Sequence, residues 1–200
     1  MYRIVAFTGA GISKASGIPT FEELGDLREK LSRSYFADNP EDFYGVLTAM
    51  KERSVKAMPN PAHLALAQYN IPVVTMNIDG LHARAGSKDV LELHGNLSYV
   101  FCPRCRRRFD FSIVKDSIRC SNCGAMLQPN VVLYGDSIPL YFDALDILGR
   151  AEEILVIGTS FYTSTAVELI SRAQMAGIET TIINKDAENE VPRILKERLG

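Results

Sequence analysis

Short apolar runs alternate with longer amphipathic stretches along most of this 200-residue chain. The runs that predict buried strands occupy residues 2–7, 71–76, 90–93, 129–135, 153–157 and 178–183. Between them, apolar residues recur at helical spacing, as in Ala166, Leu169, Ile170 and Ala173, and Gly177 is placed to end that helix. Regular alternation of strands and helices is typical of an α/β protein with a doubly wound, mostly parallel sheet. We therefore expect this fold class.

A charged stretch over residues 22–58 interrupts the alternation. Leu24, Leu27 and Leu31 share one helical face, which predicts a first helix. A second helix is predicted to begin at Asn39-Pro40-Glu41, because proline is favoured at the first position of a helix. The two helices together predict a small helical insertion in the α/β domain.

Composition narrows the possible classes of protein. The hydrophobic share of 46% is ordinary for a globular chain, and the length suits one large domain with a small inserted module. A net charge of −2 argues against a broad nucleic-acid or membrane surface. The N-terminal sequence lacks the features of a signal peptide, and no apolar run is long enough to span a membrane. We expect a cytoplasmic protein that binds neither membranes nor nucleic acids.

Four cysteines form two C-x-x-C pairs just past the middle of the chain. Cys102 and Cys105 are separated from Cys120 and Cys123 by fourteen residues, a spacing close to that of zinc ribbons. Four thiolates suit a tetrahedral Zn²⁺ ion and leave no open position for water. The pattern therefore predicts a structural zinc ion rather than a catalytic one.

Four arginines surround the first cysteine pair: Arg104, Arg106, Arg107 and Arg108. The simpler interpretation is a solvated rim of the zinc ribbon. The alternative is a surface that attracts an acidic partner or a phosphate.

Polar and glycine-rich segments follow the predicted strands directly. Gly9-Ala10-Gly11 follows the first strand, Asn77 and Asp79 follow the second, and His94 ends the third. Later strands end at Gly135, Ser160 and Asn184. Ligands of open parallel sheets bind beyond the carboxyl ends of the strands, and closely spaced glycines let backbone N–H groups approach an anion. We expect all of these endings to lie along one edge of the sheet and to form a ligand site.

Two further histidines have less specific surroundings. His63 lies in the first turn of a helix that Asn60 and Pro61 are predicted to start, a position that is usually structural or exposed. His82 follows the Asn77–Asp79 turn and either lines the site or packs within its loop.

Several motifs occur together in this chain. They are GAGISKASGIPTF (residues 9–21), TMNIDGLHARAG (75–86), ELHG (92–95), the four-cysteine module, PNVVLYGD (129–136), GTS (158–160) and Asn184 after a late strand. With this set, in this order, the chain resembles the sirtuin family of NAD-dependent protein deacylases. The resemblance implies two substrates, NAD and an acyl-lysine protein or peptide, that meet in a cleft between two domains.

The resemblance also implies where the domains lie. A Rossmann-like NAD-binding domain is expected over residues 1–21, 59–97 and 129–200. The helical insertion (22–58) and the zinc ribbon (98–128) are expected to form the small domain.

Roles for single residues follow from the same resemblance. His94 is expected to be the general base, with Asn77 at the nicotinamide ribose and Asp79 at the carboxamide. Val132, Tyr134 and Gly135 match the strand that pairs with the substrate peptide. The cofactor-binding residues implied are Gly9, Ala10, Gly11, Ile12, Ser13, Phe21, Asn77, Ile78, Asp79, Gly158, Thr159, Ser160, Asn184 and Asp186.

The chain departs from the family's pattern at three positions. It has Thr20 and Glu22 where members usually have Asp and Arg, and Met76 where they have Gln. A carboxylate at position 22 reverses the local charge, which predicts weaker binding of a pyrophosphate. Leu47 and Met50 align with the Tyr-x-x-Arg pair of members that remove succinyl groups, which predicts an uncharged acyl group here.

Two alternatives to a lysine deacylase stay open at this point. A mono-ADP-ribosyltransferase or an NAD glycohydrolase would cleave the same glycosidic bond of NAD in the same site. A non-enzymatic NAD-sensing or binding module is the second alternative, although such a module has no need of the base predicted at His94.

Overall fold

A five-stranded parallel sheet forms the larger part of the molecule in this computed structural model, which describes residues 1–20, 23, 25, 27–159 and 164–200. The strand order is β3-β2-β1-β7-β8. The strands are β1 (Tyr2–Thr8), β2 (Val73–Thr75), β3 (Val90–Glu92), β7 (Ala151–Ile157) and β8 (Glu179–Ile183). All four neighbouring pairs are parallel, which confirms the predicted Rossmann-like α/β class.

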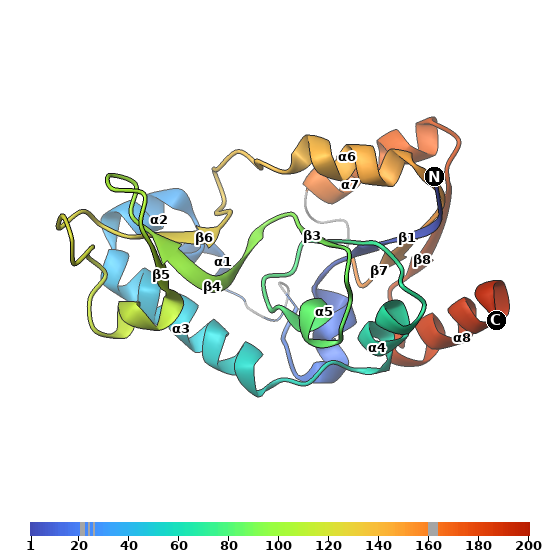
Figure 1. Cartoon of the computed structure of the whole chain (residues 1–200), viewed down its shortest axis with the longest axis horizontal. Helices are drawn as coiled ribbons and strands as arrows, with labels where there is room; N and C mark the ends of the chain where they lie inside the picture. The colour runs from blue at the N-terminus through green and yellow to red at the C-terminus, as the bar shows by residue number, and fades with distance from the viewer. Residues whose placement is uncertain (21–22, 24, 26, 160–163) are drawn as a thin grey trace.

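Helices cover both faces of this sheet (Figure 1). Helices α4 (Pro61–Gln68) and α8 (Ala187–Leu199) lie on one face, and α6 (Tyr141–Gly149) and α7 (Ser164–Met175) lie on the other. The buried strand β1 serves both cores, because successive side chains of a strand point to opposite faces. Ile4 and Ala6 pack in the core under α4 and α8, whereas Val5 and Phe7 pack in the core under α6 and α7.

A second, smaller domain contains a three-stranded antiparallel sheet of order β5-β4-β6. Its elements are β4 (Gly95–Phe101), β5 (Arg108–Asp110) and β6 (Gln128–Val131), the helices α1 (Leu27–Lys30), α2 (Arg33–Asp38) and α3 (Pro40–Lys56), and the short 3₁₀ helix η2 (Phe111–Lys115). One hydrophobic core joins the helical insertion to the zinc ribbon. Phe36, Phe43 and Tyr44 pack ring against ring in it, and the Tyr44 hydroxyl donates to the Leu127 carbonyl oxygen at 2.7 Å.

Two sequence-based expectations about elements are wrong. The run at 129–135 does not join the parallel sheet, because β6 pairs antiparallel with β4, and the end at Gly135 is therefore not at the edge of the large sheet. The predicted first helix is replaced by two short ones, α1 and α2 (Leu24 lies outside the described residues). The break has a local cause: Ser32 is extended, caps α2 by accepting from the Tyr35 N–H at 3.1 Å, and bridges to Tyr134.

The direction of the sheet's winding reverses between β1 and β7. From β1 the chain proceeds to β2 and β3 on one side, and β7 and β8 lie on the other. Such a reversal opens a crevice at the carboxyl ends of the two central strands. The 3₁₀ helix η1 (Ala10–Ser16) begins at this point, directly after β1.

Three glycines allow the chain segments after β1 and β7 to touch at the reversal. A Cβ atom on Gly11 would lie 2.6 Å from the Gly158 Cα atom, and one on Gly9 would lie 2.8 Å from the Gly158 carbonyl oxygen. Gly158 itself has φ of +63°, a conformation that favours glycine.

Within the part of the chain that the structure describes, no helix combines the length and the apolar character needed to cross a bilayer.

Replacement of Gly158 by alanine is expected to destabilise the fold. The added methyl group would overlap the backbone of Gly11 and Ile12, and the residue would remain at positive φ. We expect Gly158→Ala to lower the free energy of unfolding by about 2–4 kcal/mol in a urea titration. The control is Gly45→Ala in the middle of α3, where a Cβ atom meets nothing within 4 Å and should stabilise by up to ~1 kcal/mol. Equal stability of Gly158→Ala and the wild type would contradict this account.

Candidate functional site

A cleft of about 1220 Å³ runs between the edge of the parallel sheet and the small domain. The large domain contributes the segments that follow β1, β2, β7 and β8, and the small domain contributes residues of the helical insertion and the segment after β6. The predicted site residues that line it are Gly9, Ala10, Gly11, Ile78, His94, Val132, Tyr134, Gly135, Gly158, Thr159, Asn184 and Asp186. The predicted residues Phe21 and Ser160 lie outside the described residues.

His94 lies in the wall of the cleft, between β3 and β4. Its Nδ1 atom is 3.0 Å from the Met76 carbonyl oxygen, which can only accept a hydrogen bond. Nδ1 therefore carries the proton, and Nε2 of the neutral ring has a free lone pair. Burial lowers the pKa of His94, and the Met76 carbonyl opposes this shift in part. The ring is thus neutral near pH 7, the state that a general base requires.

Behind the cleft, Ser13, Asn77 and Asp79 form one hydrogen-bonded cluster. The Ser13 hydroxyl donates to Asp79 Oδ2 at 2.7 Å and accepts from Asn77 Nδ2 at 3.2 Å. Asn77 also donates to the Gly9 carbonyl oxygen at 3.2 Å, and Asp79 Oδ1 accepts from the Leu81 N–H at 2.9 Å. The cluster connects the turn after β1 with the turn after β2. None of these three side chains is among those that line the cleft, and neither is the buried Ile12.

The other two histidines are buried beside this cluster. Their rings are 4.8 Å apart between centroids, and neither lines the cleft. His63 Nε2 is 3.4 Å from the Ser13 hydroxyl, and His82 Nε2 is 3.0 Å from the Thr8 hydroxyl. Burial lowers the pKa of His63 to about 4 and that of His82 to about 3. Both rings are therefore neutral and packed in the interior. Of the two interpretations of His82, lining the site or packing within its loop, the structure supports the second.

The segments after β7 and β8 meet at the far end of the cleft. Asn184 Oδ1 accepts from the Thr159 N–H at 3.0 Å, and Asp186, with φ of +52°, precedes α8. The Thr159 hydroxyl oxygen is buried and has no hydrogen-bond partner among the described residues. The glycines at the floor of the cleft have no side chains above the backbone, which leaves room for an extended polar ligand such as NAD.

Several charged residues of the cleft were not predicted as site residues. Lys14 and Glu23 line it and form an ion pair at 2.8 Å between Nζ and Oε1. Arg28 places its guanidinium 5.1 Å from the centre of the Tyr134 ring. Of these charged residues, only Lys14 had a signal in the sequence, because it interrupts a glycine-rich turn.

The two apolar residues that align with the Tyr-x-x-Arg pair lie in different places. Met50 lines the cleft, whereas Leu47 is buried in the small domain's core.

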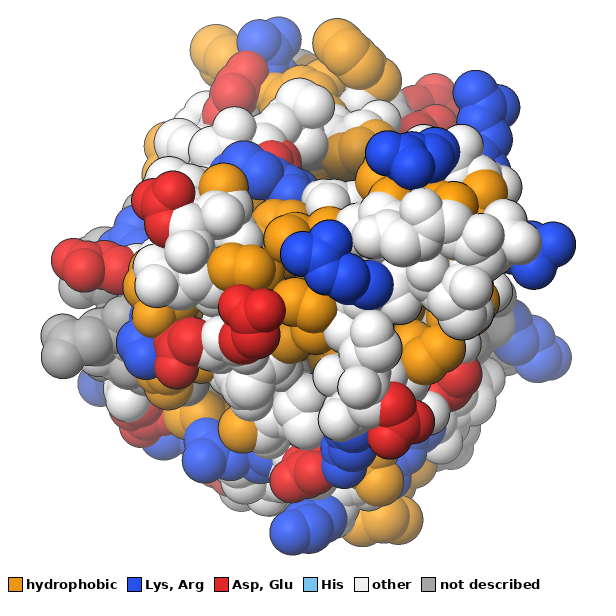
Figure 2. Space-filling model, turned by 90° about the vertical axis from the view of Figure 1, so that its left-hand side faces the viewer, with side chains coloured by type: hydrophobic (Ala, Val, Ile, Leu, Met, Phe, Trp, Pro, Cys, Tyr) orange, Lys and Arg blue, Asp and Glu red, His pale blue; other side chains and the backbone are white. Residues whose placement is uncertain are grey.

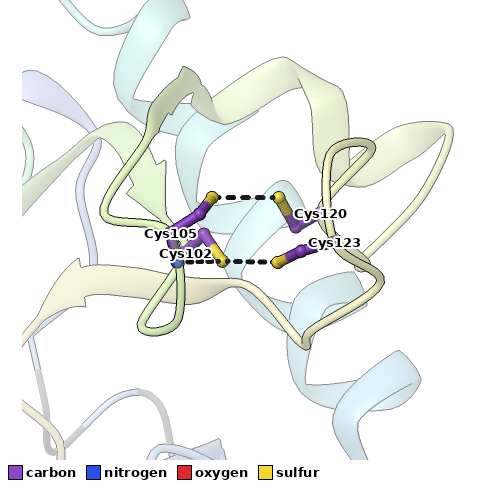
Figure 3. Close-up of side chains that lie close together, drawn as sticks. All are labelled: Cys102, Cys105, Cys120 and Cys123. Atoms are coloured by element: carbon purple, nitrogen blue, oxygen red, sulfur yellow. Dashed lines mark hydrogen bonds between the residues drawn. The ribbon is translucent and has the colours of Figure 1, made fainter.

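The four cysteines lie together at the end of the small domain, as Figure 3 shows. Their Sγ atoms all lie within 4.8 Å of one another, with Cys102–Cys123 at 3.4 Å and Cys105–Cys120 at 3.6 Å. A tetrahedral Zn²⁺ with Zn–S bonds of about 2.3 Å requires sulfur separations of about 3.8 Å. The four thiols therefore fit a structural zinc ion, as predicted.

Two arginines hydrogen-bond to the turns that hold the cysteines. Arg104 donates to the Cys123 carbonyl oxygen at 3.3 Å, and Arg119 donates to the Gly124 carbonyl oxygen at 3.4 Å. Figure 2 views the molecule from the small-domain end, where basic, acidic and apolar side chains are interspersed over the described residues. This mixture fits a solvated rim better than a surface for an acidic partner.

Comparison with known proteins identifies the family. Residues 9–165 match the sequence model of the Sir2 family. The chain belongs to the Sir2 family. The resemblance to sirtuins drawn from its motifs is thereby confirmed.

Similar proteins of this family span most of the chain. An NAD-dependent protein deacetylase of Staphylococcus aureus is 38% identical over 204 residues, which cover 92% of this chain and 83% of that protein. NAD-dependent protein deacetylase 1 of Pyrobaculum aerophilum is 37% identical over 199 residues, which cover 91% and 78%. A Sir2 protein solved with a p53 peptide and NAD⁺ is 31% identical with a TM-score of 0.87, covering 98% of this chain and 92% of that one. A Sir2 protein bound to a propionylated peptide has the same identity and coverage and a TM-score of 0.86.

Removal of zinc is expected to unfold the small domain first. The cysteines belong to the same core as the helical insertion, so the binding free energy of the metal also stabilises that core. We expect about one equivalent of zinc in the purified protein by elemental analysis, and well under one equivalent in Cys120→Ser. Chelation should abolish the protection of small-domain amides against hydrogen exchange while the parallel sheet keeps its own. A fully folded and protected small domain without zinc would contradict this prediction.

The buried histidine pair predicts a loss of stability in acid. The folded-state pKa values of about 4 and about 3 lie below the ordinary value of 6.5, so the unfolded chain takes up protons that the folded chain does not as pH falls below 6.5. The free energy of unfolding should therefore be highest above pH 6.5 and fall toward pH 4 by on the order of 3 kcal/mol for each histidine.

Denaturant titrations of the wild type and of His82→Gln over this pH range test the prediction. Between pH 6.5 and pH 4, the free energy of unfolding of His82→Gln should fall by less than that of the wild type. Acid release of zinc affects both proteins equally, so the difference between them isolates the histidine. Parallel curves for the two proteins would assign the pH dependence to other groups. Asp79 is not one of them, because its raised pKa stabilises the folded state as pH falls.

Proposed function

We propose that this chain is an NAD-dependent protein lysine deacetylase that releases nicotinamide and transfers the acyl group to ADP-ribose. The observation that carries the proposal is the state of His94: a neutral ring, held through Nδ1, with Nε2 available in the wall of the cleft. A pure binding module has no use for a positioned base. The family's curated relatives act as NAD-dependent protein deacetylases, which agrees with this arrangement.

NAD binds in the part of the cleft formed by the glycine turns and the segments after β7 and β8. Gly9, Gly11 and Gly158 keep the floor free of side chains, so backbone can approach the phosphates closely. Asn184 and Asp186 line the cleft at the adenosine end and offer polar side chains there. When bound, NAD supplies an electrophilic ribose carbon whose leaving group is nicotinamide. His94 then holds or accepts a proton at Nε2, since Nδ1 is engaged by Met76.

The Ser13 cluster positions residues for this site from behind. Asp79 accepts a hydrogen bond from the Ser13 hydroxyl, and this bond fixes the carboxylate relative to the turn after β1. Asn77 is proposed to contact the nicotinamide ribose, and Asp79 to contact the carboxamide. Both contacts require that the turn after β2 exposes these side chains to the cleft when NAD binds. Ile78, which lies between them in the chain, already lines the cleft.

The acyl-lysine peptide is proposed to lie along the segment that follows β6. Main-chain pairing with Val132, Tyr134 and Gly135 would give affinity with little dependence on the peptide's side chains. The Val132 N–H donates to the His94 carbonyl oxygen at 2.9 Å and the Tyr134 N–H donates to the Leu31 carbonyl oxygen at 3.1 Å. These two N–H groups hold the segment in place, so the peptide would pair with other main-chain groups of it. Met50 in the cleft wall favours an uncharged acyl group. Four thiolates for zinc suit a reducing compartment, and we place the enzyme in the cytoplasm.

His94→Ala is expected to lower deacetylation of an acetyl-lysine peptide by about 10²- to 10⁴-fold. Mass spectrometry after incubation with NAD measures the products, and O-acyl-ADP-ribose distinguishes deacetylation from the free ADP-ribose of a glycohydrolase. ADP-ribose affinity of the variant should change much less than its turnover. Wild-type activity should also decrease as the pH is lowered through the pKa of His94, which is itself lowered by burial, since only the neutral ring accepts a proton.

Ser98→Ala, at an exposed position of β4, is the control and should keep normal turnover. His63 and His82 are unsuitable controls, because both are buried in the core. Near-normal deacetylation by His94→Ala, with the fold intact, would remove this residue from the mechanism.

A further inference from the structure

One cationic side chain emerges directly from the glycine turn at the floor of the cleft. Lys14 is in η1, three residues after Gly11, and its side chain is 64% exposed. It lines the cleft together with Gly9, Ala10 and Gly11. A lysine at this place can reach an anion that lies over the glycine turn.

The partner of Lys14 is a carboxylate that is fixed from another side. Glu23 Oε1 is 2.8 Å from Lys14 Nζ, while Glu23 Oε2 accepts from the Thr20 N–H at 2.9 Å and from the Thr20 hydroxyl at 3.2 Å. The Lys14 ammonium, with Thr20 in support, lowers the pKa of Glu23 to about 2, so the carboxylate is ionised at neutral pH. Thr20 retains Glu23 when Lys14 turns away.

The ion pair is weak enough to be exchanged. Both partners are largely exposed, and surface ion pairs of this kind contribute little to stability. A diphosphate offers more negative charge and more acceptor oxygens than one carboxylate. Exchange of Glu23 for a diphosphate oxygen is therefore favourable for Lys14.

The other cations of the cleft are placed for different parts of a ligand. Among the described residues that line it, these are Arg28 and Lys185. Arg28 lies over the Tyr134 ring on the peptide side, and Lys185 follows Asn184 at the far end. Position 22, where an arginine is usual in the family, is a glutamate in this sequence. Lys14 is thus the cation at the glycine turn.

We propose that Lys14 binds the diphosphate of NAD and that Glu23 holds it when the nucleotide is absent. This inference rests on the proposed function, since it requires NAD in the cleft. The charge that binds the diphosphate then comes from the 3₁₀ helix after the glycine turn. Glu23 acts as a competing anion, so it sets the affinity without contacting the nucleotide.

Calorimetric titration of ADP-ribose tests the proposal without any catalytic step. Lys14→Ala should weaken ADP-ribose affinity by about 5- to 20-fold at low salt, and the loss should shrink toward twofold near 1 M salt, where the Debye length is about 3 Å. Lys14→Arg should restore affinity to within about threefold, because it restores the charge. Glu23→Gln should tighten binding in the wild type and have no effect in the Lys14→Ala background, which is the signature of a direct coupling.

The matched control is Lys30→Ala. Lys30 forms a similar ion pair, 2.9 Å from Asp42, but does not line the cleft, so its removal should leave ADP-ribose affinity unchanged. Wild-type affinity in the Lys14→Ala variant, or a loss that does not depend on salt, would overturn the inference while the proposed function stands. Failure of the wild type itself to bind ADP-ribose and NAD would overturn both.

Discussion

The backbone contact between the turns after β1 and β7 is the constraint on which the rest of the structure depends. The Gly11 N–H donates to the Gly158 carbonyl oxygen at 2.9 Å, and the Gly9 N–H donates to the Ile157 carbonyl oxygen at 2.9 Å. Side chains at these glycines would separate the two halves of the sheet where its winding reverses. The floor of the cleft is therefore made of backbone, and a charged dinucleotide can lie close to it.

The proposed catalytic residues are held around this floor by hydrogen bonds from different elements. The Met76 carbonyl at the end of β2 sets the tautomer of His94, and the His94 carbonyl in turn holds the segment after β6 through Val132. The proposed base and the proposed peptide strand are thus linked through the same residue. The Ser13 cluster adds the third connection, from the turn after β1 to the turn after β2.

Much of this could be predicted from the sequence because the signals are local. Apolar runs predicted the strands of the large sheet, paired cysteines predicted the zinc site, and polar strand ends predicted the cleft. The wrong expectations concern pairing between distant segments: an apolar run such as 129–135 does not reveal which sheet it joins, and β6 finds its partner in β4. The Lys14–Glu23 pair and the packing of His63 against His82 likewise depend on contacts between segments, for which a single sequence has no periodic signal.

The core that the zinc ribbon shares with the helical insertion has a consequence beyond stability. Leu31, Met50 and Tyr134 belong to this core together with the cysteines, and the same three residues form part of the cleft wall. By mass action, a ligand that binds only the folded form raises the population of that form according to its free concentration. For a zinc ion held by the four cysteines, the free zinc concentration would thus set what fraction of the molecules has a complete cleft, although none of the cysteines lines it.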